Sequence, residues 1–228
     1  MQHLAMIMDG NRRWAKANKL QVFKGHEKGA EAIKTAVNFC LKENIPYLSL
    51  YTFSLENFNR SEEEKNYLFS ILAKRLRERL PYFIENEVRV RFIGERSFFP
   101  QQTLEFINEA ETKTANFNKL NLNFLFCYGS RQEILNATQI IAHKVKNNEL
   151  DPKDITAKMF ESNFWMAGVP DPEIIIRTGG ENRLSNFLIY QGAYSELMPL
   201  DICWPEISEN ILLQCKERFD SIKRNFGK

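Results

Sequence analysis

The sequence lacks the features that mark nucleotide-binding, zinc-binding and nucleic-acid-binding proteins. It contains neither G-x-G-x-x-G nor G-x-x-x-x-G-K-[ST], the common phosphate-binding loops of nucleotide-binding domains. Its four cysteines form no C-x-x-C pair and have no histidine at zinc-ligand spacing, which favours buried thiols in a reducing compartment. The net charge of +2 is too balanced for a general nucleic-acid binder, although it leaves room for a small site with several arginines.

Long hydrophobic runs are absent as well. The apolar run from His3 to Met8 is followed at once by Asp9 and then by two arginines, which is not the pattern of a signal peptide. No stretch approaches the ~20 apolar residues of a membrane-spanning helix. We therefore expect a soluble, cytoplasmic protein that can still touch a membrane surface, and we expect residues 1–228 to form one domain.

The composition still provides for a sizeable core. Hydrophobic residues make up 43% of the chain, and 18 residues are phenylalanine. The phenylalanines belong either to an ordinary core or to the wall of an apolar cavity, and composition alone does not separate these alternatives.

Short apolar runs alternate with longer amphipathic stretches along the chain. The short runs predict strands at Leu4–Met8, Tyr47–Phe53, Val88–Ile93, Leu120–Phe126, Ile174–Ile176, Phe187–Tyr190 and Leu200–Trp204. The amphipathic stretches predict helices at Gly29–Glu43, from Ser61 with a kink or break at Pro81, at Thr103–Asn116, from Ser130 to about Lys146, at Asp151-Pro152 and at Ser208–Arg224. Ser61 with Glu64, and Ser130 with Glu133, match the capping-box pattern. The alternation predicts an α/β fold with a mainly parallel central sheet flanked by helices.

Ligands of parallel sheets bind at the carboxyl ends of the strands, so the residues that follow each strand are the candidates for chemistry. The first strand is followed by Asp9-Gly10-Asn11-Arg12-Arg13-Trp14. Gly10 lets backbone amides approach an anion, and the two arginines add charge-assisted donors. A carboxylate in such a loop suggests Mg²⁺ between it and a phosphate. The alternative is a helix-capping aspartate with solvated arginines.

Two further loops carry mixed polar groups. Ser54-Leu55-Glu56-Asn57-Phe58-Asn59-Arg60 follows the second strand, and a plain capped loop does not explain its amide together with its arginine. Arg177-Thr178-Gly179-Gly180-Glu181-Asn182-Arg183-Leu184-Ser185-Asn186 follows Ile174–Ile176, and its arginines beside a Gly-Gly turn suit a diphosphate. The alternative for that segment is a polar hairpin. His26 and Glu196, taken alone, fit surface or capping residues equally well. Together the three arginine-containing loops predict a site for one or two diphosphates.

These motifs, in this order, resemble the cis-prenyltransferase family, and within it the bacterial undecaprenyl diphosphate synthases. The matching stretches span nearly the whole chain and are MIMDGNRRWAK, KGHEKGA, LSLYTFSLENFNRS, IRTGGENRLSNFL, YSEL and the Trp-Pro of ICWPE. The resemblance implies repeated cis-condensation of isopentenyl diphosphate onto an allylic diphosphate, typically farnesyl diphosphate. It also implies a homodimer, a hydrophobic product tunnel and a long product, most plausibly undecaprenyl diphosphate, the carrier precursor for cell-wall polysaccharides.

The resemblance assigns roles to matched positions. Asp9 is implied to bind Mg²⁺ and position diphosphate, Asn57 to assist proton removal, and Glu196 to be a second metal carboxylate. The implied substrate contacts are Gly10, Asn11, Arg12, Arg13, Trp14, His26, Ser54, Leu55, Glu56, Phe58, Arg60, Arg177, Arg183, Leu184 and Ser185. Among them, Arg177, Arg183 and Ser185 match the isopentenyl diphosphate clamp.

Some positions differ from the usual family pattern. Arg12 replaces a glycine, Val22 an arginine and Asn182 a histidine, while Phe58 keeps the aromatic character of a frequent tryptophan. Three other functions compete with this prediction: a non-catalytic subunit of a two-component prenyltransferase, a phosphatase or kinase built on similar loops, and the same chemistry with a shorter product. The retained Asp9 and arginines weigh against the first, and the missing nucleotide motif weighs against a kinase.

Overall fold

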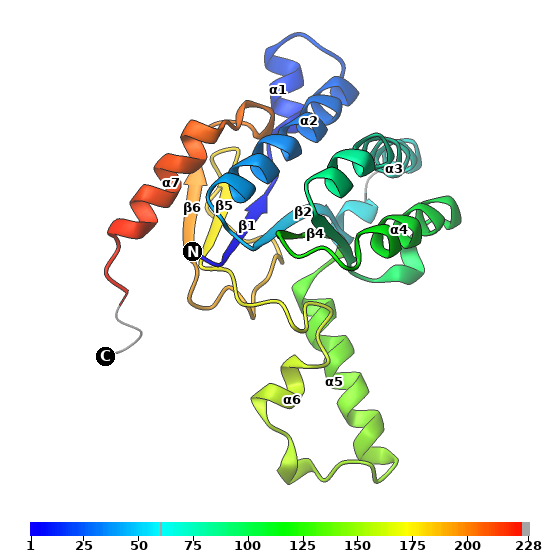
Figure 1. The fold of residues 1–228 in the computed structure, drawn as a ribbon. Coiled ribbons are helices and arrows are strands. Elements are labelled where there is room, and N and C mark those ends of the chain that lie inside the picture. Colours follow the sequence, from blue (N-terminus) through cyan, green and yellow to red (C-terminus); the bar gives the residue numbers. More distant parts are fainter. Residues whose placement is uncertain (60, 225–228) are drawn as a thin grey trace.

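Six parallel strands form one sheet in the order β3-β4-β2-β1-β5-β6 in the computed structural model, which describes residues 1–59 and 61–224 (Figure 1). The strands are β1 (His3–Ile7), β2 (Tyr47–Ser54), β3 (Val88–Ile93), β4 (Leu120–Tyr128), β5 (Ile174–Thr178) and β6 (Glu196–Leu200). The helices are α1 (Asn11–Ala17), α2 (Val22–Lys42), α3 (Glu62–Glu85), α4 (Gln101–Thr114), α5 (Ser130–Lys146), α6 (Ala157–Glu161) and α7 (Glu209–Ser221). Short 3₁₀ turns are η1 (Leu55–Asn59), η2 (Arg96–Phe98), η3 (Pro152–Asp154) and η4 (Trp204–Glu206). The predicted parallel α/β sheet is confirmed.

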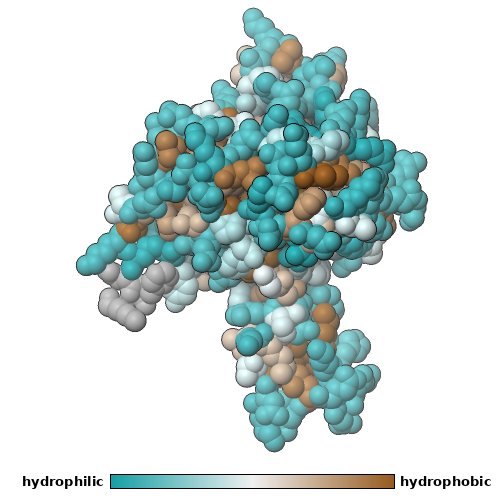
Figure 2. All heavy atoms as spheres, viewed as in Figure 1, coloured by the Kyte–Doolittle hydropathy of each residue, from teal (hydrophilic) through white to brown (hydrophobic). Residues whose placement is uncertain are grey.

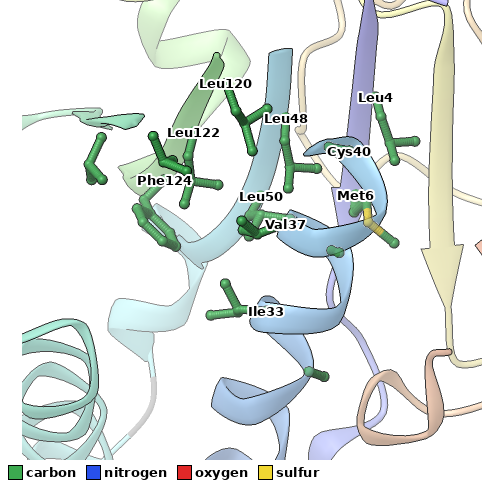
Figure 3. Packing of buried hydrophobic residues seen from close by; sticks show 14 of the residues in the cluster. Leu4, Met6, Ile33, Val37, Cys40, Leu48, Leu50, Leu120, Leu122 and Phe124 are labelled. Atoms are coloured by element: carbon green, nitrogen blue, oxygen red, sulfur yellow. The ribbon is translucent and has the colours of Figure 1, made fainter. Parts of the chain in front are cut away.

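The larger hydrophobic core lies between the sheet and the helices α2, α3, α4 and α7. Figure 3 shows Ile33, Val37 and Cys40 of α2 directed at the leucines of β1, β2 and β4. A smaller cluster, including Leu125 of β4 together with Met166 and Phe187 from the segments around β5, covers the opposite face. Both faces of the central strands are therefore buried, which explains why those strands appear in the sequence as continuous apolar runs.

Helix α2 begins at Val22, seven residues before the predicted start at Gly29. The apolar periodicity that indicates a helix is missing from the first turns of α2, because glycines occupy the positions where apolar residues would be expected. A side chain at Gly25 or Gly29 would collide with Asn11, so these glycines let α2 lie directly against the loop after β1. The close approach places His26, in the second turn, beside that loop.

Four other local predictions are wrong. Residues Phe187–Tyr190 form turns rather than a strand, because Asn186 and Leu188 have left-handed backbone conformations, with φ of 64° and 43°. The last strand is Glu196–Leu200, ahead of the predicted Leu200–Trp204. Of the kink or break predicted at Pro81, the break is wrong: helix α3 continues through Pro81, with buried residues on both sides of that turn.

The predicted capping box of Ser130 and Glu133 is also wrong, because Ser130 already lies inside α5. Instead, Glu133 is completely buried and accepts hydrogen bonds from the Tyr128 hydroxyl at 2.6 Å, the Gln191 amide at 2.9 Å and the Met166 N–H at 2.9 Å. Burial raises the pKa of this carboxyl group, while its hydrogen bonds oppose the shift. The Ser61 cap is confirmed: its side chain accepts from the Glu64 N–H at 3.3 Å. Among the described residues, no helix is long and apolar enough to cross a membrane.

A buried histidine links three segments at the amino end of the sheet. His3 is fully buried, with Nδ1 2.6 Å from the Pro170 carbonyl and Nε2 2.8 Å from the Ser49 hydroxyl. Burial lowers its pKa from 6.5 to about 4, because it penalises the charged imidazolium more than the Pro170 carbonyl and the charge of Glu173 favour it.

We expect the stability of the protein to fall in mild acid because of His3. The unfolded chain binds a proton near pH 6.5 and the folded chain only near pH 4, so the stabilisation is complete above pH 6.5 and is lost as the pH falls through that window. The loss should reach roughly 3 kcal/mol at most. Urea unfolding between pH 7 and pH 4 measures it. His3→Gln should flatten this dependence, whereas the exposed His143→Gln should leave it intact; equal curves for all three proteins would contradict the assignment.

Candidate active site

The loops after β2, β1 and β5 meet at one edge of the sheet. Ile7, the last residue of β1, lies opposite Tyr51 of β2 and Arg177 of β5, so the segments that follow these strands converge. They enclose a cleft of about 600 Å³. Its lining comprises Ile7, Met8, Asp9, Asn11, His26, Tyr51, Thr52, Ser54, Glu56, Asn57, Leu68, Arg177, Ser185 and Asn186. The predicted convergence of the three loops is confirmed.

Asp9 is fixed at the centre of this edge. Its backbone N–H donates to the Thr178 hydroxyl at 3.0 Å, and its carbonyl accepts from the same hydroxyl at 2.7 Å and from the Trp204 N–H at 2.9 Å. Its carboxylate accepts from the Gly10 N–H at 2.6 Å and from Arg177 Nη2 at 2.9 Å. About a third of the side chain, 32%, stays exposed to the cleft, so the carboxylate is held in place and still accessible.

Arg177 is the main cation of the cleft and only 5% of its side chain is exposed. Besides Asp9, its guanidinium donates to the Ser185 hydroxyl at 2.8 Å and to the Arg183 carbonyl at 2.5 Å. Its buried Nε has no hydrogen-bond partner among the described residues. A buried N–H that lacks an acceptor costs free energy, and a ligand oxygen would satisfy it.

The cations around Asp9 keep it ionised. Partial burial acts to raise the pKa of this carboxyl group, but the hydrogen bond and charge of Arg177, the Gly10 N–H and the charge of Arg13 outweigh burial, so the pKa lies below its usual value. Asp9 is therefore an anion that can hold a cation, not a proton donor near neutral pH.

The loop after β1 forms a second, smaller hollow of about 310 Å³ beside the cleft, lined by Met8, Asp9, Gly10, Asn11, Arg12, Arg13 and His26. Gly10 has a φ of 101°, which favours glycine, and a Cβ there would lie 2.9 Å from Cβ of Cys203. Arg13 donates to the Gly179 carbonyl at 2.6 Å and lies 3.3 Å from Asp9. Arg12 is more exposed and pairs with Glu64 of α3 at 3.7 Å.

Asn57 caps its own loop. Its side-chain oxygen accepts the Ser54 N–H at 3.1 Å, so the amide is oriented with that oxygen engaged. Glu56, one residue earlier, accepts from the Asn186 side chain at 2.7 Å. The segment after β2 is thus tied to the segment after β5.

An apolar cavity of about 80 Å³ adjoins the cleft between α2 and α3. Met8, Asn11, His26, Thr52 and Leu68 line both the cleft and the cavity. The cavity continues along Ile33, Phe53 and Phe126. A molecule with an anionic head and an apolar tail would find complementary surroundings for both of its ends.

Several predicted contacts do not line the cleft. Phe58 packs against Phe53, Phe69 and Phe98 with ring centroids 5.3, 6.2 and 5.0 Å apart, and Leu55 packs against the main core. Trp14 lies on the half-exposed side of α1, and Leu184 packs against the smaller cluster. The Arg183 guanidinium is exposed and pairs with Glu181 at 2.5 Å. Arg60 lies outside the described residues.

Glu196 is not brought to Asp9 within one chain. It begins β6 and lies opposite Ile174, at the amino end of the sheet, whereas Asp9 follows the carboxyl end of β1. A five-residue strand at ~3.3 Å per residue separates the two ends. The role of Glu196 as a second metal carboxylate was implied by the family resemblance alone, and within one chain the fold does not bring this residue to Asp9.

Sequence reasoning also missed residues that hold the site. Thr178 and Trp204 fix the Asp9 backbone, and Trp204 Nε1 donates to the Gly29 carbonyl at 2.7 Å. Tyr51 and Asn186 line the cleft. Thr178 and Asn186 belong to the polar segment after β5, so their place in the sequence indicated that they lie near the site. The sequence did not indicate which residues their side chains contact.

The donor set fits a hard divalent cation that is shared with a substrate. Among the described residues there is no cluster of three or more acidic, histidine or cysteine side chains able to hold a metal alone. Asp9 nevertheless offers a partly exposed, ionised carboxylate beside an anion-binding loop. Mg²⁺ is usually bound by one or two carboxylates together with phosphate oxygens and water, so one carboxylate suffices.

The fold and site define an α/β protein with an anion-binding edge that leads into an apolar cavity. A family model described as putative undecaprenyl diphosphate synthase matches residues 7–227. The chain is 41% identical to the (2E,6E)-farnesyl-diphosphate-specific ditrans,polycis-undecaprenyl-diphosphate synthase of Micrococcus luteus, over 99% of this chain and 91% of that protein. It is 38% identical to the isoprenyl transferase of Thermotoga maritima, over 99% and 96% of the two chains.

Two solved structures are similar throughout. A probable undecaprenyl diphosphate synthase from Campylobacter jejuni shares 31% identity with a TM-score of 0.82, covering 100% of this chain and 99% of that one. Lavandulyl diphosphate synthase from Lavandula x intermedia, in complex with dimethylallyl diphosphate, shares 30% identity with a TM-score of 0.96, covering 100% and 98%. The chain belongs to the undecaprenyl diphosphate synthase family of prenyltransferases.

Proposed function

We propose that the chain extends farnesyl diphosphate by sequential cis-condensation with isopentenyl diphosphate, giving a long polyprenyl diphosphate, namely undecaprenyl diphosphate. One observation carries the proposal: the cleft of Asp9 and Arg177 shares a wall with an apolar cavity. An anionic head can lie in the cleft while an apolar chain enters the cavity. Each buried methylene would gain ~0.8 kcal/mol, so a growing tail would be retained.

The positively charged groups of the site divide into two sets, one for each substrate diphosphate. The hollow of Gly10, Asn11 and Arg13 suits the allylic diphosphate, whose tail then faces His26 and Thr52 at the cavity entrance. Arg177, with Ser185, suits isopentenyl diphosphate. The double bond of isopentenyl diphosphate attacks the allylic carbon, pyrophosphate departs with the bonding pair, and one proton leaves the new chain. Fixed cations stabilise the departing pyrophosphate, and holding the reactants in line supplies proximity.

Mg²⁺ belongs to the proposal as the cofactor that would be held by Asp9 and a substrate diphosphate. When bound, it would neutralise negative charge on the leaving pyrophosphate. Arg13 and Arg177 hold the Asp9 carboxylate in position for it.

The homodimer is also a proposal. Glu196 can contribute to the metal site only from a second copy, because within one chain it lies at the other end of the sheet. Figure 2 shows hydrophobic surface on the arm formed by α5 and α6, where Leu135 and Ile155 are exposed. Such residues suit contact with a partner chain or with a membrane surface during product release.

The direct test is elongation by the purified protein alone. With Mg²⁺, farnesyl diphosphate and labelled isopentenyl diphosphate, we expect a ladder of prenyl products ending at a defined length, measured by chromatography after dephosphorylation. Release of inorganic phosphate or pyrophosphate without chain growth would instead indicate a hydrolase, and elongation only with an added partner would indicate a two-component enzyme.

Asn57→Ala should lower kcat more than it raises KM for either substrate. An amide is a poor base, and its oxygen already accepts from Ser54, so Asn57 would orient a proton path rather than take the proton. Steady-state kinetics with each substrate varied in turn separate the two effects. A change confined to KM would make Asn57 a binding residue only.

Thr52→Leu should shorten the product. Thr52 lines both compartments, so a larger side chain there would obstruct the passage from the cleft into the apolar cavity. Thr52→Val changes little volume and should leave product length unchanged. Melting temperature and product length should be measured on the same samples; a folded Thr52→Leu protein with the wild-type product would reject this entrance. Phe126 of β4 lines the cavity as well, whereas Leu120, Leu122 and Phe124 of the same strand are packed in the core.

A further inference from the structure

Asn186 lies where the segment after β5, the start of α5 and the segment after β2 meet. Its side-chain oxygen accepts from the Arg131 N–H at 2.8 Å. Its side-chain NH₂ group donates to Glu56 at 2.7 Å and to Gln132 at 3.0 Å. Its backbone carbonyl accepts from the Ser130 N–H at 2.8 Å. Every polar atom of this side chain is therefore used to join segments that are distant in sequence.

The residue type fits this position closely. Only an amide offers both the acceptor for the N–H at the start of α5 and two donors for the oxygens of Glu56 and Gln132. Asparagine also tolerates the left-handed backbone that occurs here, with a φ of 64°. Gly129 completes the fit, because a Cβ there would lie 2.7 Å from the Asn186 amide nitrogen.

Both neighbours of this junction belong to the cleft. Glu56 directly precedes Asn57, whose side chain caps Ser54. Ser185 directly precedes Asn186 and accepts from Arg177, which in turn holds Asp9. A displacement of Asn186 would therefore move both the segment that carries Asn57 and the hydrogen bond between Ser185 and Arg177. Asn186 itself need not touch the reacting atoms.

We propose that Asn186 is a positioning residue that couples the Asn57 segment to the Arg177 clamp, so that each half of the cleft is ordered only when the other is. The inference rests on the proposed prenyl transfer. It adds that the hydrogen bond from Asn186 to Glu56 sets how the second substrate is engaged.

The test removes the donor of the hydrogen bond from Asn186 to Glu56 and then, in a double variant, restores the bond with donor and acceptor exchanged. Asn186→Asp keeps the acceptor for α5 but places a second carboxylate against Glu56. We expect kcat/KM for isopentenyl diphosphate to fall roughly 10- to 100-fold, the effect of losing a hydrogen bond to a charged group. The KM for farnesyl diphosphate should change little. Lower pH should restore part of the loss, because one of two facing carboxylates then takes up a proton.

Adding Glu56→Gln to Asn186→Asp should rescue the enzyme, because the new amide can donate to the new carboxylate. Asn118→Asp, the same change at an exposed position ahead of β4 and outside the cleft, serves as the control and should match the wild type. Hydrogen exchange of residues 54–59 without substrate should be faster in Asn186→Asp and normal in the double variant.

The outcomes separate the two proposals. A wild-type protein that does not transfer prenyl groups overturns the proposed function, while the hydrogen-exchange comparison still tests the coupling. A wild-type-like Asn186→Asp protein, or a double variant that folds but shows no rescue in kinetics and exchange, overturns the role of Asn186.

Discussion

Replacement of Asp9 by asparagine should reduce kcat by roughly 10²–10³-fold, the usual effect of removing one preorganised electrostatic group from an active site. Asparagine keeps the shape and can still accept from the Gly10 N–H, but it cannot offer a negative charge to Mg²⁺. Asp9→Ala should be at least as severe. Steady-state turnover with farnesyl and isopentenyl diphosphate, at saturating Mg²⁺, measures the effect.

The fold should survive both changes, because Asp9 lies in a loop and Arg177 keeps its bonds to Ser185 and to the Arg183 carbonyl. Circular dichroism and melting temperature check this. Asp154→Asn, the same exchange at an exposed aspartate of η3 outside the cleft, should leave turnover unchanged. EDTA should abolish turnover of the wild type; full activity in chelator would disprove the Mg²⁺ role.

Arg177→Ala should weaken isopentenyl diphosphate binding by roughly 10- to 100-fold, since a lost charged hydrogen bond costs about 1.5–3 kcal/mol. Farnesyl diphosphate binding should change less, because its proposed site lies in the hollow after β1. Arg177→Lys should restore little, since an ammonium group cannot span Asp9, Ser185 and the Arg183 carbonyl as the planar guanidinium does. Binding of each substrate by calorimetry gives both numbers.

Arg183→Ala should act in the same direction with a smaller effect, because the Arg183 side chain is 61% exposed and already pairs with Glu181. Arg131→Ala provides a matched change at an exposed arginine at the start of α5. Equal losses of both substrates in Arg177→Ala would contradict the assignment of Arg177 to the isopentenyl diphosphate site.

The strand-end loops were predictable because parallel sheets gather strand ends at one edge, and the runs that form β1, β2 and β5 are clear. Asp9, Asn57, Arg177 and Ser185 therefore lie where the sequence placed them. Glu196 was assigned by resemblance and not by its place after a strand, and it begins β6 at the opposite end of the sheet.

The direction in which each side chain points could not be predicted from the sequence. Phe58 and Asn57 are adjacent, yet Asn57 lines the cleft while Phe58 joins an aromatic cluster under α3. The early start of α2 was hidden because Gly25 and Gly29 serve a contact with Asn11, a residue that only the fold brings near. Contacts between distant segments decided each of these cases.

The small size of the apolar cavity has a consequence for chain growth. At about 80 Å³ it is far smaller than the cleft beside it, and a tail of many isoprene units needs more room. Under the proposed function, the space between α2 and α3 would have to widen as each isoprene unit is added. Widening would separate packed helices at a rising cost in free energy, and that cost would limit the length of the product.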